Sequence, residues 1–264
     1  MDPAAQFRAY HATLFRAWGR PHWWPARSRF EVIVGAYLTQ NTAWTNVERA
    51  LRQLRAARAL SVNGIRNTPP RKLQALIRSS GYFRQKAQRL KTFVAFLDQH
   101  YRGSLDRMFA QPTSTLREQL LSLNGVGPET ADSILLYAGQ HPVFVVDAYT
   151  RRILERHGIV PANAPYEEIR AFCEGSLNAK CSSSAREADS PPIEFSRNHN
   201  PQETAANAGA CHAPSPMSLA ARAPLAQIYN DMHGLIIGVG KNYCLKSKPK
   251  CDECPLQKFL PGVK

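Results

Sequence analysis

A glycine loop at the start of a helix comes first among the residues that could do chemistry. Four residues form the loop: Asn124, Gly125, Val126 and Gly127. Two glycines so close together allow a sharp turn that presents backbone N–H groups, and Pro128 and Glu129 then suit the first turn of a helix. Such a loop can bind an anion, and a DNA phosphate is the anion that we expect.

A carboxylate follows the helix that this loop begins. The helix is expected over residues 128 to about 138, which makes it roughly 16 Å long. The apolar residues 143–146 come next and lead directly to Asp147. The loop and the acid would therefore lie at opposite ends of a short rod, which suits a protein that grips a strand and acts on a nucleotide. The alternative is that Asp147 only caps the next helix.

Two adjacent tryptophans stand between prolines near the N-terminus. Trp23 and Trp24 are followed by Pro25, so this segment is stiff and bulky. Neighbouring side chains rarely enter one core together, and an extruded base is commonly read by stacking between aromatic rings. We expect at least one ring to line a base pocket. The alternative is a pair that seals the join between domains.

The composition favours a polyanionic partner. The 264 residues carry a formal net charge of +14, with a sequence pI near 9.8. A charge of this sign and size favours nucleic acid through counterion release. The hydrophobic fraction of 44% is ordinary for a packed core, and no run approaches the ~18 apolar residues of a membrane span. The N-terminal segment lacks a signal-peptide core, which predicts a cytoplasmic, nucleoid-associated protein.

Helical periodicity dominates the sequence, and residues 30–138 show no strand alternation, so the predicted fold class is all-α. Six helices are expected there, over residues 30–43, 46–60, 68–80, 86–97, 113–123 and 128–138. Others are expected over residues 1–20, 151–158, 166–177 and 224–240. The stretch 178–222 is rich in Ser, Ala, Asn and Pro, which predicts an inserted, disordered loop.

Together, the loop, the helix and the acid resemble the helix-hairpin-helix DNA glycosylases, and among them the endonuclease III class. The pattern of that class is L-x-G-V-G-x-x-T-A, a helix, and then V-D. Eight residues carry it here: Leu123, Gly125, Val126, Gly127, Thr130, Ala131, Val146 and Asp147. The resemblance implies a two-lobed all-α fold. A six-helix domain, 29–138, would end in the hairpin, and 1–28 with 139–264 would form a second helical domain that carries a Cys-rich, iron–sulfur type loop.

One departure from the class pattern concerns the reaction. Bifunctional members place a lysine directly before the Thr-Ala pair, and its amine attacks the sugar and later nicks the strand. Glu129 stands there in this chain and cannot form a Schiff base. The resemblance therefore implies a monofunctional glycosylase that uses water, as in the 3-methyladenine glycosylases of the class, which share G-x-E-[ST]-A-D. Asp147 would stabilise positive charge on the sugar or activate water. Glu129 is a second catalytic candidate, or simply an acid at a helix N-terminus.

The resemblance also implies which residues contact DNA. Gln40, with Asn41 beside it, would enter the duplex and fill the gap left by the base; the alternative is a polar residue at a helix end. Lys86 would lie near the DNA backbone or stay a solvated lysine. The implied phosphate contacts are Asn124, Gly125, Val126, Gly127, Thr130 and Arg151. The implied base pocket comprises Trp23, Trp24, Pro25 and Trp44.

Three of the six cysteines crowd the C-terminus, which favours a metal or cluster over disulfides. Their spacing resembles the first three ligands of the class motif C-x6-C-x2-C-x5-C, which holds a [4Fe–4S] cluster; the residues are Cys244, Cys251 and Cys254. Leu260 occupies the fourth position. Water, a nearby carboxylate or another cysteine could complete the site; the candidates are Asp252, Glu253, Cys173, Cys181 and Cys211. A three-thiolate zinc site or no metal are the alternatives.

These observations predict a monomeric enzyme that acts on double-stranded DNA containing a damaged base, with no membrane partner. An alkylated purine is the preferred substrate, because its positive charge attracts aromatic faces and it is already a good leaving group. Uracil, mismatched thymine and oxidised bases stay open. The alternatives are a bifunctional glycosylase and lyase that uses another amine, and a non-catalytic DNA module that reads damage.

Overall fold

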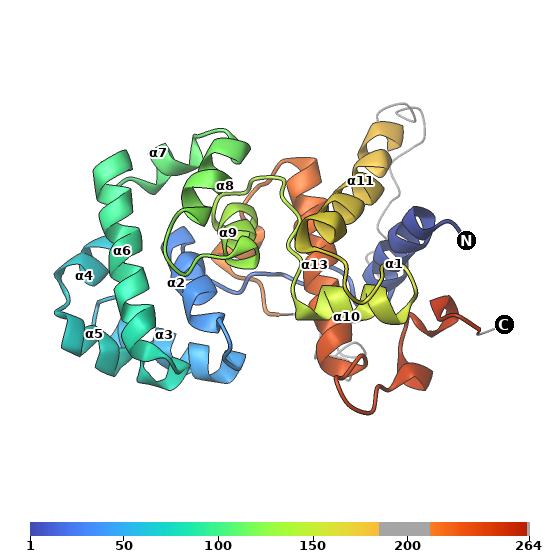
Figure 1. The fold of residues 1–264 in the computed structure, drawn as a ribbon, viewed down its shortest axis with the longest axis horizontal. Coiled ribbons are helices and arrows are strands. Elements are labelled where there is room, and N and C mark those ends of the chain that lie inside the picture. Colours follow the sequence, from blue (N-terminus) through green and yellow to red (C-terminus); the bar gives the residue numbers. More distant parts are fainter. Residues whose placement is uncertain (185–211, 263–264) are drawn as a thin grey trace. The chain divides into compact units, whose positions relative to one another are not determined.

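The computed structural model describes residues 1–184 and 212–262, with side chains up to residue 178 in the first range. The described residues are helical and joined by turns, with no strand among them, so the all-α prediction is confirmed. The chain divides into two compact units (Figure 1). One comprises residues 26–143, and the other comprises residues 1–25 with 144–264. The predicted six-helix domain, residues 29–138, begins a few residues after the first of these units begins and ends a few residues before it ends.

Residues 26–143, all of them described, form the hairpin unit, which holds the six expected helices and two short ones. Its helices are α2 (Arg29–Thr39), α3 (Trp44–Ala56), α4 (Val62–Asn67), α5 (Pro70–Leu76), α6 (Phe83–Tyr101), α7 (Leu105–Phe109), α8 (Thr113–Leu121) and α9 (Pro128–Ser133). Only α4 and α7 were not expected. Each is one or two turns long, too short for an apolar stripe to repeat. Ser61 and Ser104 cap them instead, each by accepting a backbone N–H.

The core of this unit surrounds α2. This helix packs against α3, α6 and α9, and its residues from Phe30 to Leu38 are all buried. The helix that begins at Pro128 continues beyond α9 as a π-helical turn, Ile134–Ala138, so the expected length is confirmed. Because α2 lies against α9, the segment that follows α2 is brought beside the glycine loop that precedes α9.

The second unit is organised around α13 (Pro224–Asn242). Figure 1 shows α1 (Pro3–Trp18), α10 (Ala148–Arg156) and α11 (Tyr166–Ser184) around it, and each of them packs against α13. Gly240 allows the close approach of α10, because a Cβ there would lie 2.3 Å from Cδ1 of Tyr149. Because α13 has no side chain at Gly240, Tyr149 packs directly against it. This contact fixes the start of α10, where Asp147 lies.

The predicted loop over residues 178–222 is corrected at both ends. At its start, α11 continues to Ser184. At its end, residues 212–222 are placed and include α12 (Pro216–Leu219). Ser215 and Ser218 form a reciprocal capping box around Pro216, so local hydrogen bonds make this short helix where apolar content is low. The rest of the predicted loop, residues 185–211, lies outside the described residues.

Short 3-10 turns at Cys251–Glu253 and Gln257–Phe259 finish the described chain. In the parts of the chain that the structure describes, every helix is too short or too polar to cross a membrane.

Candidate active site

Asp147 caps α10 with one oxygen and faces a histidine with the other. Its backbone is extended, and Oδ1 accepts the N–H of Thr150 at 2.8 Å. Oδ2 lies 3.6 Å from Nε2 of His233, a buried residue of α13. The side chain of Asp147 is 13% exposed. The capping role is therefore confirmed, and it leaves a second oxygen that faces His233.

The carboxyl of Asp147 is held in its ionised form. Burial alone would raise its pKa, but the charge and hydrogen bonding of His233 and the N–H of Thr150 outweigh that effect. Its pKa therefore lies below the ordinary value, because the charged form faces the His233 imidazole and accepts a donated hydrogen bond. Near neutral pH the group is an anion, which can stabilise positive charge or accept a proton from water.

The helix that carries His233 also supports the tryptophan segment. A Cβ on the next residue, Gly234, would lie 2.8 Å from Cβ of Trp23. Further along α13, Nζ of Lys241 lies 5.6 Å from the Trp23 ring centroid. Two consecutive residues of α13 thus lie against Asp147 and against Trp23, respectively. The sequence prediction treated these groups as separate features.

Both tryptophans are buried in the free protein. Trp23 and Trp24 are each 5% exposed, with ring centroids 5.0 Å apart, and Pro25 is half-buried. Residues after the undescribed stretch cover this segment: His212 lies 5.2 Å from the Trp23 ring, and Ser215 Oγ donates to the carbonyl of Trp24 at 3.2 Å. The base pocket stays a prediction, and its aromatic members would have to be uncovered before a base could stack on them.

The glycine loop has the expected turn, but only one of its glycines needs a positive φ. Gly125 has φ +80°, whereas Gly127 has φ −93° and ψ 176°, which any residue adopts. Val126 is buried, and its N–H donates to the carbonyl of Leu123 at 3.0 Å. Asn124 and Gly127 are exposed. The loop is thus anchored by Val126 and shows its flanking residues to solvent.

Gln40 is bound to this loop. Its Nε2 donates to the carbonyl of Gly125 and to Oγ1 of Thr130, both at 2.9 Å. Its Oε1 accepts from Nη1 of Arg89 at 2.8 Å. The predicted wedge residue and the predicted phosphate loop are therefore in contact, and Arg89, which sequence reasoning did not single out, holds them together.

The predicted DNA contact at Lys86 is wrong. Lys86 is 1% exposed, and its Nζ donates to the carbonyls of Leu38 and Ser80 at 2.8 and 2.7 Å and to Oγ1 of Thr42. Burial lowers its pKa to about 8, with a smaller effect from the charge of Arg89. The lysine does not reach the surface. From the interior it binds the carbonyl of Leu38 at the end of α2, and so it fixes the segment that carries Gln40.

Other predicted residues are on or near the surface. Asn41 is exposed with φ +51°, and Glu129 is exposed in the first turn of α9. Trp44 is half-buried and donates its indole N–H to Glu48 at 2.9 Å. Arg151 donates one guanidinium N–H to the carbonyl of Ala164 at 2.5 Å. Their contacts with DNA or with a base stay predictions.

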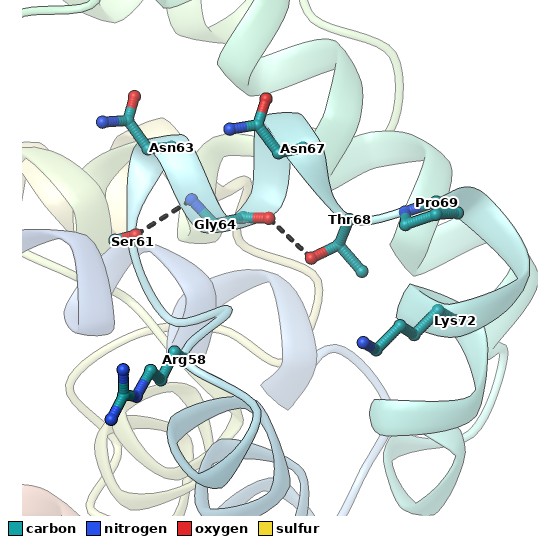
Figure 2. Close-up of a pocket in the computed structure, with 8 residues that line it drawn as sticks. All are labelled: Arg58, Ser61, Asn63, Gly64, Asn67, Thr68, Pro69 and Lys72. Atoms are coloured by element: carbon teal, nitrogen blue, oxygen red, sulfur yellow. Dashed lines mark hydrogen bonds between the residues drawn. The ribbon is translucent and has the colours of Figure 1, made fainter.

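A surface depression of about 380 Å³ lies beside α4 in the hairpin unit (Figure 2). It is lined by Arg58, Ser61, Asn63, Gly64, Asn67, Thr68, Pro69 and Lys72. The two dashed contacts in Figure 2 are internal caps of α4: Ser61 Oγ accepts from the Gly64 N–H, and Thr68 Oγ1 donates to the Gly64 carbonyl. It contains no aromatic ring and no carboxylate, so it lacks the groups expected of a base pocket.

Among the described residues, the C-terminal cysteines do not complete a four-cysteine site. Burial raises the pKa of the Cys254 thiol, a hydrogen bond from the Leu256 backbone lowers it, and Cys244 and Cys251 raise it further. Leu260 is half-buried at the fourth position. Among the residues described, no three His, Cys, Asp or Glu side chains are grouped so as to hold a metal ion. The described residues therefore do not fit a cluster with four cysteine ligands.

The cysteine loop is nevertheless held firmly against α10. Arg156 donates to Sγ of Cys244 at 3.3 Å and to the carbonyl of Leu245 at 2.7 Å. Arg152 donates to the carbonyl of Cys244 at 2.7 Å. Two arginines of the helix that Asp147 caps thus fix the loop. Of the other cysteines, Cys173 is buried in α11, and the side chains of Cys181 and Cys211 lie outside the described residues.

Known proteins are similar to this chain in sequence and in fold. The family model of the HhH-GPD superfamily of base excision DNA repair proteins matches residues 34–179. Over 244 residues, 38% are identical to a protein of Methanocaldococcus jannaschii named as a candidate DNA repair glycosylase, which covers 92% of this chain and 90% of that one. Endonuclease III of Thermotoga maritima is 33% identical over 147 residues, which cover 54% of this chain and 63% of that one.

A solved structure is similar over almost the same length. The 3-methyladenine DNA glycosylase of H. pylori, bound to 1,N6-ethenoadenine, matches with a TM-score of 0.68 and 27% identity. The match covers 91% of this chain and 98% of that chain.

Proposed function

The chain belongs to the HhH-GPD superfamily of base excision DNA repair proteins, in its endonuclease III class, and from this premise we propose a monofunctional reaction on an alkylated purine. The chain is a DNA glycosylase of base excision repair. The proposal is that it hydrolyses the N-glycosidic bond of the damaged nucleotide with water and leaves an abasic site.

The observation that carries the monofunctional proposal is the identity of residue 129. Lyase chemistry needs an amine that forms a Schiff base with the sugar. Glu129 stands in the first turn of α9, at the place where bifunctional members have that amine. Lys86, the lysine whose pKa is lowered to about 8, is 1% exposed and bound to backbone carbonyls, so it does not replace the missing nucleophile.

Asp147 supplies the chemistry of the proposed reaction. Loss of the base leaves positive charge on the sugar, and a carboxylate nearby stabilises that charge in the transition state. The low pKa of Asp147 keeps it ionised, and its Oδ2 is the oxygen that does not cap α10. Water then completes the hydrolysis, activated by the same carboxylate. Glu129 is the second carboxylate proposed for the site.

An alkylated purine suits this machinery better than a neutral base. Its positive charge makes it a good leaving group, so one carboxylate is sufficient. Aromatic faces attract a cation, and Trp23, Trp24, Pro25 and Trp44 are the proposed base pocket. The similarity to the H. pylori 3-methyladenine glycosylase supports this choice, since the protein is 27% identical over nearly the whole chain.

Double-stranded DNA with a damaged base is the proposed partner. The net charge of +14 favours it. The proposed contacts are Gln40, Asn41, Asn124, Gly125, Val126, Gly127, Thr130 and Arg151. Gln40 would fill the gap left by the extruded base, and the hairpin residues would hold a phosphate. A monomer is proposed as the active form.

A [4Fe–4S] cluster is proposed for the C-terminal loop, held by Cys244, Cys251 and Cys254 with a fourth ligand that is not a cysteine of that motif. The spacing of the three cysteines and the contact of Arg156 with Cys244 support a metal-binding loop. When bound, such a cluster would brace the loop against α10, and it has no part in the proposed hydrolysis.

The direct test is a panel of duplexes that each contain one damaged base. Release of an alkylated purine, with intact strands until alkali is added, is the expected result. Reaction in the presence of borohydride should give no covalent protein–DNA adduct. An adduct would overturn the monofunctional proposal, and release of only uracil or oxidised bases would overturn the substrate. Binding without release of any lesion would indicate the non-catalytic module.

A further inference from the structure

Arg89 on α6 has no role in the mechanism described so far, yet it ends a chain of hydrogen bonds that includes the proposed wedge. Its Nη1 donates to Oε1 of Gln40 at 2.8 Å, and Nε2 of Gln40 donates to Gly125 and Thr130. A guanidinium only donates and a backbone carbonyl only accepts, so these partners fix the orientation of the amide. Both halves of the Gln40 amide are therefore occupied in the free protein.

The guanidinium lies directly against the hairpin glycine. A Cβ on Gly125 would be 2.0 Å from Nε and 2.4 Å from Cζ of Arg89. Arg89 is itself only half-buried. A positive group therefore stands on the loop proposed to bind a phosphate, and part of it is open to solvent.

The backbone and the side chain of the wedge are held in different ways. Lys86, one turn before Arg89 on α6, binds the carbonyls of Leu38 and Ser80 from inside the unit. These buried contacts fix the main chain that leads to Gln40. The side chain of Gln40 is held only by partly buried contacts with Arg89 and the hairpin. The side chain can therefore move while the main chain stays in place.

We propose that Arg89 is a positioning residue, which holds Gln40 on the hairpin in the free protein and releases it when a DNA phosphate takes over the guanidinium. A phosphate oxygen is a charged acceptor, and a phosphate can pair with a guanidinium through two parallel hydrogen bonds, whereas Arg89 makes one to the amide oxygen of Gln40. When the hydrogen bond from Arg89 is lost, Oε1 of Gln40 is free to accept a hydrogen bond from the orphaned base. Phosphate binding and gap filling are thereby coupled. This inference rests on the proposed role of Gln40 as the wedge.

The coupling has a definite sign in a double-mutant cycle. The four proteins are the wild type, Arg89→Ala, Gln40→Ala and the double variant. Arg89→Ala loses a phosphate contact but no longer has to release Gln40, so part of the loss is offset. In the Gln40→Ala background nothing offsets it. We expect Arg89→Ala to weaken binding about three- to tenfold more in the Gln40→Ala background.

The measurement uses a duplex with an uncleavable abasic analogue opposite 2-aminopurine, titrated at several salt concentrations. The fluorescence reports unstacking, and the salt slope reports phosphate contacts. Arg89→Ala should lower the slope by about 0.9, the value for one phosphate, and Arg89→Lys should keep it. In the free protein, the side-chain amide of Gln40 should exchange its hydrogens faster in Arg89→Ala. Melting temperatures identify any variant that loses its fold, and Arg89→Met, which also lacks the charge, then replaces Arg89→Ala in the cycle.

Each failure has its own signature. Equal loss of affinity in both backgrounds means that Arg89 does not act through Gln40, and an unchanged salt slope means that it takes no phosphate. Either result overturns the inference. If Gln40→Ala alone leaves affinity and fluorescence unchanged, the wedge role itself is wrong. Because the duplex carries no cleavable base, a wrong assignment of the excised lesion does not affect these outcomes.

Discussion

His233 Nε2 and Asp147 Oδ2 are 3.6 Å apart, on the side of the carboxylate that does not cap α10. The imidazole is buried, and Phe144 packs edge-on against it at 6.1 Å. An aromatic wall on one side and a carboxylate on the other leave the ring little freedom. We infer that His233 orients Asp147, because a carboxylate whose two oxygens have separate neighbours keeps one rotamer.

Substitution of His233 should therefore reduce kcat and leave KM nearly unchanged. His233→Phe removes the polar neighbour, and the expected loss is up to about 10²-fold, the cost of a misplacement of about 1 Å. His233→Gln keeps a donor and should recover most of the rate. Single-turnover and steady-state measurements on the same lesion duplex separate the two parameters. Equal loss in both variants would mean that volume, not the polar contact, matters at this position.

Asp147→Asn should abolish most base release while the fold is retained. The amide keeps the cap of α10, because Asn is as good an N-cap as Asp. It cannot stabilise positive charge on the sugar, and the expected loss in rate is about 10²–10⁴-fold. The rate is measured by base release from the lesion duplex, with DNA affinity as the control. An unchanged rate would remove Asp147 from the mechanism.

The same pair of proteins should differ in the pH dependence of stability. The pKa of Asp147 is lowered in the folded state, so between the native and unfolded values the unfolded chain binds more protons. The contribution of the carboxylate is present above the unfolded pKa of about 3.9 and is lost as pH falls through the native value. The melting temperature of the wild type should approach that of Asp147→Asn as pH falls in this range. A difference that stays constant would contradict the pKa shift.

The local features of the site could be predicted from sequence. The glycine loop, the helix from residue 128 and the acid at 147 are contiguous, and each depends on neighbours within a few residues. The two lobes were predictable from the resemblance. By contrast, Arg89 and Gln40 are separated by 49 positions, and their contact depends on how α6 and α2 pack. A periodic pattern says which face of α6 is inside, but it does not say which surface residue meets which loop.

Lys86 shows why the type of a residue can mislead. A lysine is seldom buried, so a surface position was the natural expectation. The carbonyls of Leu38, at the end of α2, and of Ser80, at the end of a 3-10 turn, both need donors, and an ammonium with three donors binds both. His233 is the opposite case: it belongs to none of the sequence motifs, and only the packing of α13 against α10 brings it to Asp147.

Replacement of Lys86 should lower stability more than DNA affinity. Lys86→Met keeps the volume but removes the Lys86 donor from the Leu38 carbonyl and one of two side-chain donors, the other being the Thr42 hydroxyl, from the Ser80 carbonyl, at an expected cost of about 1–3 kcal/mol. Lys72→Met is the matched control, since Lys72 is exposed and lines the depression beside α4. Denaturant unfolding measures the difference. A variant as stable as the control, with weaker DNA binding, would restore the predicted backbone contact.

Substitution of Glu129 by lysine should give an enzyme that borohydride can trap as a covalent adduct with DNA. Glu129 is exposed in the first turn of α9, so the substitution needs no repacking. A lysine at this place provides the amine that forms a Schiff base with an abasic sugar. Glu129→Lys should give a covalent adduct with abasic DNA in borohydride, whereas Glu129→Gln and the wild type should give none. An adduct in all three proteins would locate the amine elsewhere and contradict the monofunctional assignment.

The metal content of the C-terminal loop can be tested with one variant that removes a cysteine and another that adds one. Iron and sulfide should be present in the wild type and absent from Cys251→Ala, because two cysteines do not retain a cluster. Leu260→Cys places a thiolate at the fourth position of the motif and should slow the loss of iron to a chelator. Stability should follow iron content, since Arg152 and Arg156 join this loop to α10. Zinc without sulfide in the wild type would indicate a three-thiolate site, and an unchanged rate of iron loss in Leu260→Cys would mean that another group already fills that coordination position.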